Sequence, residues 1–147
     1  MKILMVVMLL IVGTVADACN ANCLQYSSSG SSTQCPSCPC SASPLNVNVT
    51  QFTSLYSDWH GSCLDCIANK WNQGNAHAVG YEPIQNIWAI GLFRLRQEYC
   101  PNSDLCNPKI AVGCAHSIWQ SSGWAQWVVD IGSFGCSSVC INNPQQS

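Results

Sequence analysis

The chain has 147 residues, which is enough for one domain with a hydrophobic core of its own. Charged side chains make up only 8% of the sequence, and the net charge is −2. Because the sequence contains no basic patch, it excludes nucleic acid as an expected partner.

The first 18 residues have the features of a secretory signal peptide. Lys2 precedes the apolar run Ile3–Val15, and Ala16-Asp17-Ala18 then provides a cleavage site of the A-x-A type. That run is too short to span a membrane, and no later stretch is long and apolar enough to do so. We therefore expect a protein without a membrane span, either secreted or retained in the lumen of the secretory and endolysosomal pathway.

Residues 19–44 form a Ser-, Gly- and Pro-rich arm without hydrophobic periodicity, and residues 45–147 form the domain proper.

All 12 cysteines follow residue 18, five in the arm and seven in the domain. An even number of thiols in a secreted chain predicts a disulfide framework. The alternative, a zinc site around Cys35, Cys38 and Cys40, is disfavoured because oxidation competes with metal binding. We expect no metal and no cofactor. If every thiol pairs within the chain, an odd number of bridges must join the arm to the domain.

The start of the domain has helical spacing. Asn48-Val49-Thr50 is an N-glycosylation sequon, which predicts a modified, exposed Asn48. A short amphipathic helix is expected over Thr50–Trp59, and Gly61 ends it. We expect Ser62 to cap a second helix. The apolar face of that helix consists of Leu64, Ile67, Ala68 and Trp71.

Further along, residues 80–96 combine glycines and a proline with patchy alternation, which favours a small β element or an irregular loop. Asn107-Pro108 is typical of a helix start, and Gly123 ends that helix. Trp124–Val129 adds one or two more turns. The apolar face of the long helix consists of Ile110, Ala111, Cys114, Ala115 and Ile118. The pattern predicts a small, mainly helical α+β domain, rich in disulfides.

Four motifs in this order resemble the lysozyme superfamily over residues 62–136. The segment Cys63-Leu64-Asp65-Cys66-Ile67 is similar to the start of the catalytic helix in invertebrate-type lysozymes, and Trp71–Val79 aligns with the Glu-Ser-x-x-Asn-x-x-Ala-Val motif of soluble transglycosylases. Gly91–Leu95 is similar to a Gly-Leu-Phe-Gln-Ile strand, with Arg94 in place of Gln. The helix from Asn107 to Trp124 is similar to a late helix of goose-type members. The resemblance implies a lysozyme-like fold and a disulfide between Cys66 and Cys136.

The resemblance places Trp71 where the superfamily carries its catalytic glutamate. Glycoside hydrolysis needs a carboxylic acid that delivers a proton to the leaving oxygen. Lysozyme, a worked example of this chemistry, holds that glutamate in an apolar pocket that raises its pKa. An indole N–H does not ionise in a useful range, so Trp71 cannot supply the proton.

Other residues of the chain could supply or accept a proton in place of Trp71. Glu82 lies eleven residues after Trp71, and it either faces the cleft as a rearranged catalytic carboxylate or is a solvated loop residue. Glu98 is expected on the surface, and Asp65 is expected to point away from Trp71. We expect His77 and His116 to be exposed, polar residues.

Six tryptophans are many for this length, and flat indole faces suit the apolar faces of sugar rings. Trp59 and Trp127 are expected in the core. Trp88 and Trp124 either line a saccharide cleft or are buried. The expected saccharide contacts are Trp71, Asn75, Trp88, Gln120 and Trp124, and Asn86 could add a polar contact.

Two functions follow as hypotheses. The first is a monomeric, secreted lysozyme-like protein that binds β-1,4-linked amino-sugar chains, such as bacterial peptidoglycan or chitin fragments, without efficient cleavage. The second is an active, bacteriolytic lysozyme that uses rearranged carboxylates, Glu82 included. A third possibility is a scaffold that has lost its site. A role in defence against bacteria is what the resemblance implies for the first two.

Overall fold

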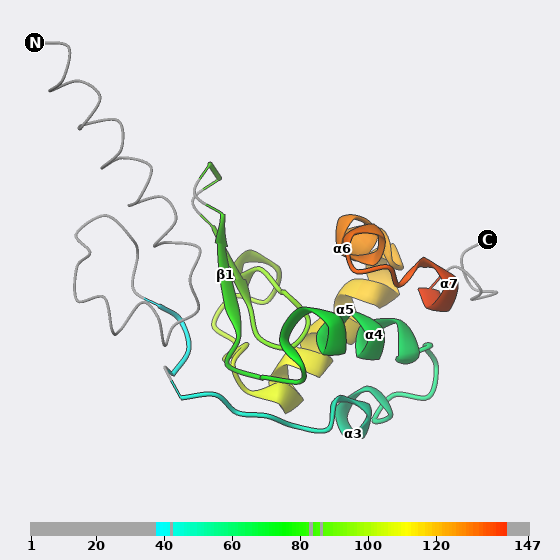
Figure 1. Ribbon diagram of the computed structural model, residues 1–147, viewed down its shortest axis with the longest axis horizontal. Coiled ribbons are helices and arrows are strands. Elements are labelled where there is room, and N and C mark those ends of the chain that lie inside the picture. Colours follow the sequence, from blue (N-terminus) through cyan, green and yellow to red (C-terminus); the bar gives the residue numbers. More distant parts are fainter. Residues whose placement is uncertain (1–37, 42, 83, 86, 141–147) are drawn as a thin grey trace, which may run out of the picture.

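The computed structural model describes residues 38–41, 43–82, 84–85 and 87–140. These residues form helices around one small antiparallel sheet, with the chain order shown in Figure 1. In order, the elements are α3 (Val49–Thr53), α4 (Ser62–Asn72), β1 (Val79–Glu82), β2 (Ile87–Ile90), η1 (Gln97–Tyr99), α5 (Pro108–Ser122), η2 (Ala125–Trp127), α6 (Val128–Ser133) and α7 (Ser137–Cys140). The expected α+β class is confirmed. The predicted signal peptide and the residues after Cys140 lie outside the described residues.

Helix α4 occupies the middle of the fold because one of its faces is wholly apolar. Leu64, Ile67 and Ala68 are fully buried, as the 3.6-residue period predicts, and Trp71 lies at the half-buried edge of the same face. Ser62 is the first helical residue rather than the cap, a position that Gly61 takes without a side-chain hydrogen bond. The helix ends at Gln73, which has a left-handed backbone with φ 55°.

Helix α3 is shorter than the sequence pattern predicts. It ends at Thr53, and the residues that follow form turns on which Trp59 is buried and Leu55 is exposed. Asp65 accepts hydrogen bonds from Thr53 Oγ1 at 2.6 Å and from Thr50 Oγ1 at 3.1 Å. Asp65 therefore binds α3 to α4 on the side away from Trp71, as expected.

Helix α5 begins where the sequence predicts. The Asn107 side chain accepts hydrogen bonds from the backbone N–H groups of Lys109 and Ile110, and Pro108 takes the first helical position. Gly123 ends the helix with φ 59°. Its buried face includes Val112, whereas Ile110, predicted to be buried, is 41% exposed.

His116 on α5 is buried, contrary to the expectation of an exposed, polar residue. It is 8% exposed, stacks on Tyr56 with ring centroids 4.0 Å apart, and places Nε2 2.7 Å from Asp58 Oδ1. That hydrogen bond is the main cause that lowers the pKa of Asp58. Helix α5 thereby fixes the turns that follow α3.

The sheet is one hairpin with Val79 paired to Ile90 and Glu82 to Ile87. The residues after β2 form a turn, not the strand that the resemblance implies, and this turn closes with the bridge between Ile90 and Leu95. Gly91 permits the turn, because its φ is 71° and a Cβ there would collide with the carbonyl oxygen of Leu105. Leu92 and Phe93 are fully buried, and Phe93 O accepts a hydrogen bond from Trp127 Nε1 at 2.9 Å.

Disulfides tie the ends of the domain to its centre. Cys66–Cys136 and Cys63–Cys140 join α4 to the C-terminal helices, and Cys100–Cys114 joins the loop after η1 to α5. Cys40–Cys106 joins the arm to the domain. Each of the seven domain cysteines is therefore paired, and the bridge predicted from the resemblance, Cys66–Cys136, is present. Cys38 is also in a disulfide, which together with Cys40 argues against zinc in the arm.

Within the described ranges, none of the helices combines the length and the apolar character that crossing a membrane requires.

Candidate functional site

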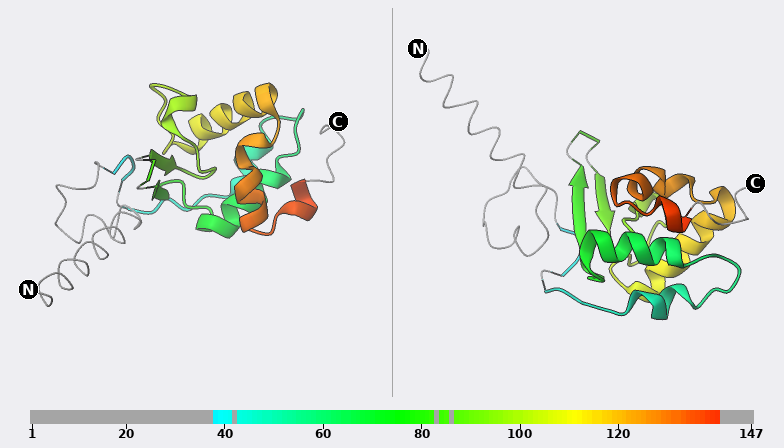
Figure 2. Two further views of the ribbon diagram at one scale, coloured as in Figure 1. Left: turned by 90° about the horizontal axis from the view of Figure 1, so that it is seen from above. Right: turned by 45° about the vertical axis from the view of Figure 1, so that its right-hand side comes forward.

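A cleft of about 560 Å³ lies between the hairpin and α6. Figure 2 (right) shows the hairpin standing beside α6, with α4 running below both. Trp71 contributes from the end of α4, and Val129 and Asp130 contribute from α6. The elements that form the walls are thus fixed to one another through the core and through Cys66–Cys136.

Aromatic and amide side chains make up much of the lining. The aromatic residues are Trp71, Tyr81 and Trp88, and the amides are Gln85 and Gln126. Tyr81 and Trp88 are opposite each other in the hairpin register, and their rings are 4.9 Å apart. Directly paired strand residues project on the same face of a sheet, so the two rings lie on one face of the hairpin. This combination of flat apolar faces and a few hydrogen-bonding groups is typical of small-molecule sites.

Arg94 lies over the floor of the cleft. Its guanidinium carbon is 4.7 Å from the centre of the Trp71 ring and 5.7 Å from that of Phe134. Its Nε is 3.2 Å from Asp130 Oδ1. The turn that presents Arg94 has a left-handed backbone at this residue, with φ 54°. A non-glycine residue in that region is strained, so the position of Arg94 is determined by the contacts of its side chain and of the turn.

Asp130 is the acidic residue of the described cleft lining. Its side chain is 18% exposed, and burial raises its pKa above 3.8, while the charge and the hydrogen bond of Arg94 oppose that rise. Arg96, which also lines the cleft, lowers the pKa more weakly. A carboxyl with a raised pKa is suited to holding a proton, but an adjacent guanidinium favours its ionised form. Asp130 is therefore better arranged to hold Arg94 than to donate a proton.

Two of the expected saccharide residues, Trp71 and Trp88, lie together in the cleft. Glu82, the expected catalytic residue, is the last residue of β1 and pairs with Ile87, and its side chain lies outside the described part of the structure. Glu98 is exposed on η1, as expected.

The structure does not bring the other three expected residues into the cleft. Trp124 is 3% exposed and packs on Trp59, with ring centroids 6.1 Å apart, because the turn after α5 folds back onto the core. Gln120 is exposed on α5, where it forms a hydrogen bond with Asp58. Asn75 binds the first residue of the domain, Leu45.

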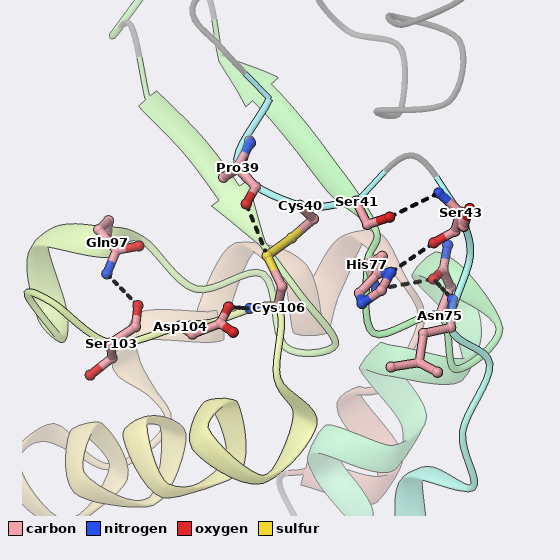
Figure 3. The surroundings of a disulfide bond; sticks show 11 residues. Pro39, Cys40, Ser41, Ser43, Asn75, His77, Gln97, Ser103, Asp104 and Cys106 are labelled. Atoms are coloured by element: carbon pink, nitrogen blue, oxygen red, sulfur yellow. Dashed lines mark hydrogen bonds between the residues drawn. A yellow bond between two sulfur atoms is a disulfide. The ribbon is translucent and has the colours of Figure 1, made fainter.

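The side chain of Asn75 serves as the acceptor for two backbone N–H groups where the arm meets the domain. Its Oδ1 accepts hydrogen bonds from the N–H groups of Leu45 and His77, each at 3.0 Å. His77, expected to be an exposed, polar residue, places Nδ1 2.7 Å from the carbonyl oxygen of Ser43 in the arm. Figure 3 shows these contacts beside the Cys40–Cys106 bridge. Asn75 therefore holds the polypeptide chain and not a ligand in this structure.

Sequence reasoning missed the charged residues of the cleft, which are Arg94, Arg96 and Asp130. A signal was present, because Arg94 and Arg96 are the two arginines of the whole chain and stand two residues apart. No local pattern could predict the ion pair between Arg94 and Asp130, because the two residues are more than thirty positions apart in the sequence and only the fold brings them together.

Comparison of the chain with protein-family models, with curated proteins and with solved structures gave no match.

Proposed function

We propose that this protein binds β-1,4-linked amino-sugar chains, such as peptidoglycan or chitin fragments, in the cleft between the hairpin and α6, and that it does not cleave them efficiently. The observation that most directly supports this proposal is that Trp71, Trp88 and amide groups line a cleft of about 560 Å³. Indole rings can stack on sugar rings, and amides can bind their hydroxyls. The protein would act outside the cell or in a lumenal compartment. The disulfides support this location, because disulfides form and persist in oxidising compartments.

The lack of efficient cleavage follows from the groups around Trp71. A glycosidase of the two-carboxylate type holds its carboxyl groups about 5–9.5 Å apart across the bond that breaks. Among the cleft residues that the structure describes, Asp130 is the one carboxyl, and it is in an ion pair with Arg94. General acid catalysis is commonly worth about 10²–10⁴-fold in rate, so its loss would leave a binding protein with little activity.

Binding would be tested by titrating the purified protein with an N-acetylglucosamine hexamer in a calorimeter. Trp71→Ala and Trp88→Ala should each weaken binding about tenfold, because a central aromatic contact typically dominates such an interface. Tyr99→Ala is the matched control, since Tyr99 is 41% exposed and does not line the cleft. Equal losses in all three variants, or unchanged affinity in both tryptophan variants, would contradict a saccharide site in this cleft.

One observation favours the second candidate, an active lysozyme with rearranged carboxylates. Asp130 lies in the cleft with its pKa raised by burial, which is the direction that a proton donor requires. In that case Glu82 would act as its partner. Clearing of a bacterial wall suspension that is lost in both Asp130→Asn and Glu82→Gln would favour this candidate, whereas clearing that persists in Glu82→Gln would remove Glu82 from the mechanism.

A further inference from the structure

The distribution of positive charge over the molecule is uneven. The protein carries a net charge of −2 and has five lysines and arginines in all. Both arginines line the cleft, and the three lysines are elsewhere in the sequence. Among the described residues, the cleft lining therefore holds two guanidinium groups against one carboxylate. Glu82, whose side chain is not described, is not included in this balance.

The two arginines differ in how much of their binding capacity is used. Arg94 is positioned by Asp130 through Nε and by the face of Trp71, and its side chain is 29% exposed. The ion pair with Asp130 engages one edge of the Arg94 guanidinium, a planar group with five N–H donors. Arg96 has a weaker contact, 3.7 Å between Nη1 and Glu98 Oε1, and both side chains of that pair are substantially exposed. The charge of Arg94 is largely balanced by Asp130, and the charge of Arg96 is available to a ligand.

We propose that the cleft selects sugar chains that carry free carboxylate groups, and that Arg96, with the outer edge of Arg94, binds the carboxylate. This inference rests on the proposed function and specifies its ligand. A planar guanidinium matches a carboxylate through two parallel hydrogen bonds, and a partly enclosed cleft strengthens that attraction relative to open solvent. The sugar ring beside the carboxylate would lie against Trp71 and Trp88.

A matched set of probes isolates the carboxylate. The first probe is a tetrasaccharide of alternating N-acetylglucosamine and N-acetylmuramic acid without stem peptides, so that its lactyl carboxylates are free. The second is the dimethyl ester of the same tetrasaccharide, in which each lactyl group carries a methyl group in place of its negative charge. The third is the N-acetylglucosamine tetramer, and the fourth is a β-1,4-linked mannuronate tetramer, which carries the carboxylate on the ring.

Calorimetric titration should show that the free acid binds about tenfold more tightly than its methyl ester, as expected for one charge-assisted pair of hydrogen bonds. Arg96→Gln should bring the two affinities together. Lys109→Gln removes one positive charge outside the cleft lining and should leave their ratio unchanged. Arg94→Gln is not used, because it would also remove the partner of Asp130.

The outcomes separate the two proposals. Equal affinity for the free acid and its ester, or a ratio that survives Arg96→Gln, would overturn carboxylate selection while leaving saccharide binding intact. Binding of none of the four probes would overturn the proposed function itself. Preference for the mannuronate tetramer over the lactyl acid would support carboxylate selection. It would also indicate that the carboxylate that the cleft binds is attached directly to the sugar ring.

Discussion

At the scale of single residues, Trp71, Arg94 and Asp130 act as one unit. Trp71 offers its ring face to the guanidinium, and Asp130 binds the guanidinium edge. Together, Trp71 and Arg94 form a cationic surface beside an aromatic one, an arrangement suited to binding a planar or anionic group.

Asp130 predicts a specific pH dependence of stability. Because its folded pKa is raised above 3.8, the folded protein retains a proton that the unfolded chain has released. This contribution to the free energy of unfolding is fully present below pH 3.8 and is lost as the pH rises through the folded pKa. The effect of one proton is limited to about 1.4 kcal/mol per pH unit.

The measurement is urea unfolding of wild type and Asp130→Asn between pH 7 and pH 4. The difference in unfolding free energy between wild type and variant should shift in favour of the wild type as the pH falls. Glu98→Gln, which removes an exposed carboxylate, is the control. A difference between wild type and Asp130→Asn that is constant over this range would show that the carboxyl has the same pKa in both states.

At the scale of elements, the first residues of the domain, which follow the arm, are attached to the segment after α4 by a small set of polar contacts. The N–H of Ala76 donates to Leu45 O at 2.8 Å, and that of Val47 donates to Gly74 O at 2.9 Å. Gly74 allows this close approach, because its φ is 81° and a Cβ there would lie 2.6 Å from Val47 O. Asn75 completes the junction through Leu45 and His77.

We predict that Asn75→Ala destabilises the protein by about 1–2 kcal/mol, because two backbone donors lose their acceptor. Asn75→Asp keeps the acceptor oxygen and should recover most of that loss. Hydrogen exchange at the Leu45 amide should accelerate in the alanine variant more than at amides within α5. If the alanine variant lost saccharide affinity without any change in exchange at Leu45, Asn75 would be a ligand-binding residue, as its sequence position first suggested.

Local sequence patterns predict several of the helices well, but they predict poorly which distant residues a given side chain contacts. The spacing of Leu64, Ile67 and Ala68 predicts the buried face of α4, and Asn107 predicts the start of α5, because both depend on neighbours within a few residues. Asn75 and Trp124 were expected in the cleft, and their actual partners lie far away in the sequence. Such partners are set by tertiary packing, which a single sequence does not contain.

At the scale of the whole molecule, disulfides and an aromatic core hold a short chain in a fixed shape around the cleft. Cys66–Cys136 closes a loop with a sequence separation of 70 residues, and cross-links of this length typically contribute about 2–4 kcal/mol. Trp59, Trp124 and Trp127 belong to the core, where the ring of Trp124 packs on the other two. The walls of the cleft are therefore preformed, which reduces the entropy lost when a ligand binds.

The central claim is that the cleft holds a sugar chain without breaking it. Native mass spectrometry of the protein after prolonged incubation with the free-acid tetrasaccharide measures both properties at once, because the mass of the complex reveals whether the bound sugar is whole. The account predicts a complex whose added mass equals that of the intact tetrasaccharide. Free or bound disaccharide products in place of that complex would contradict it.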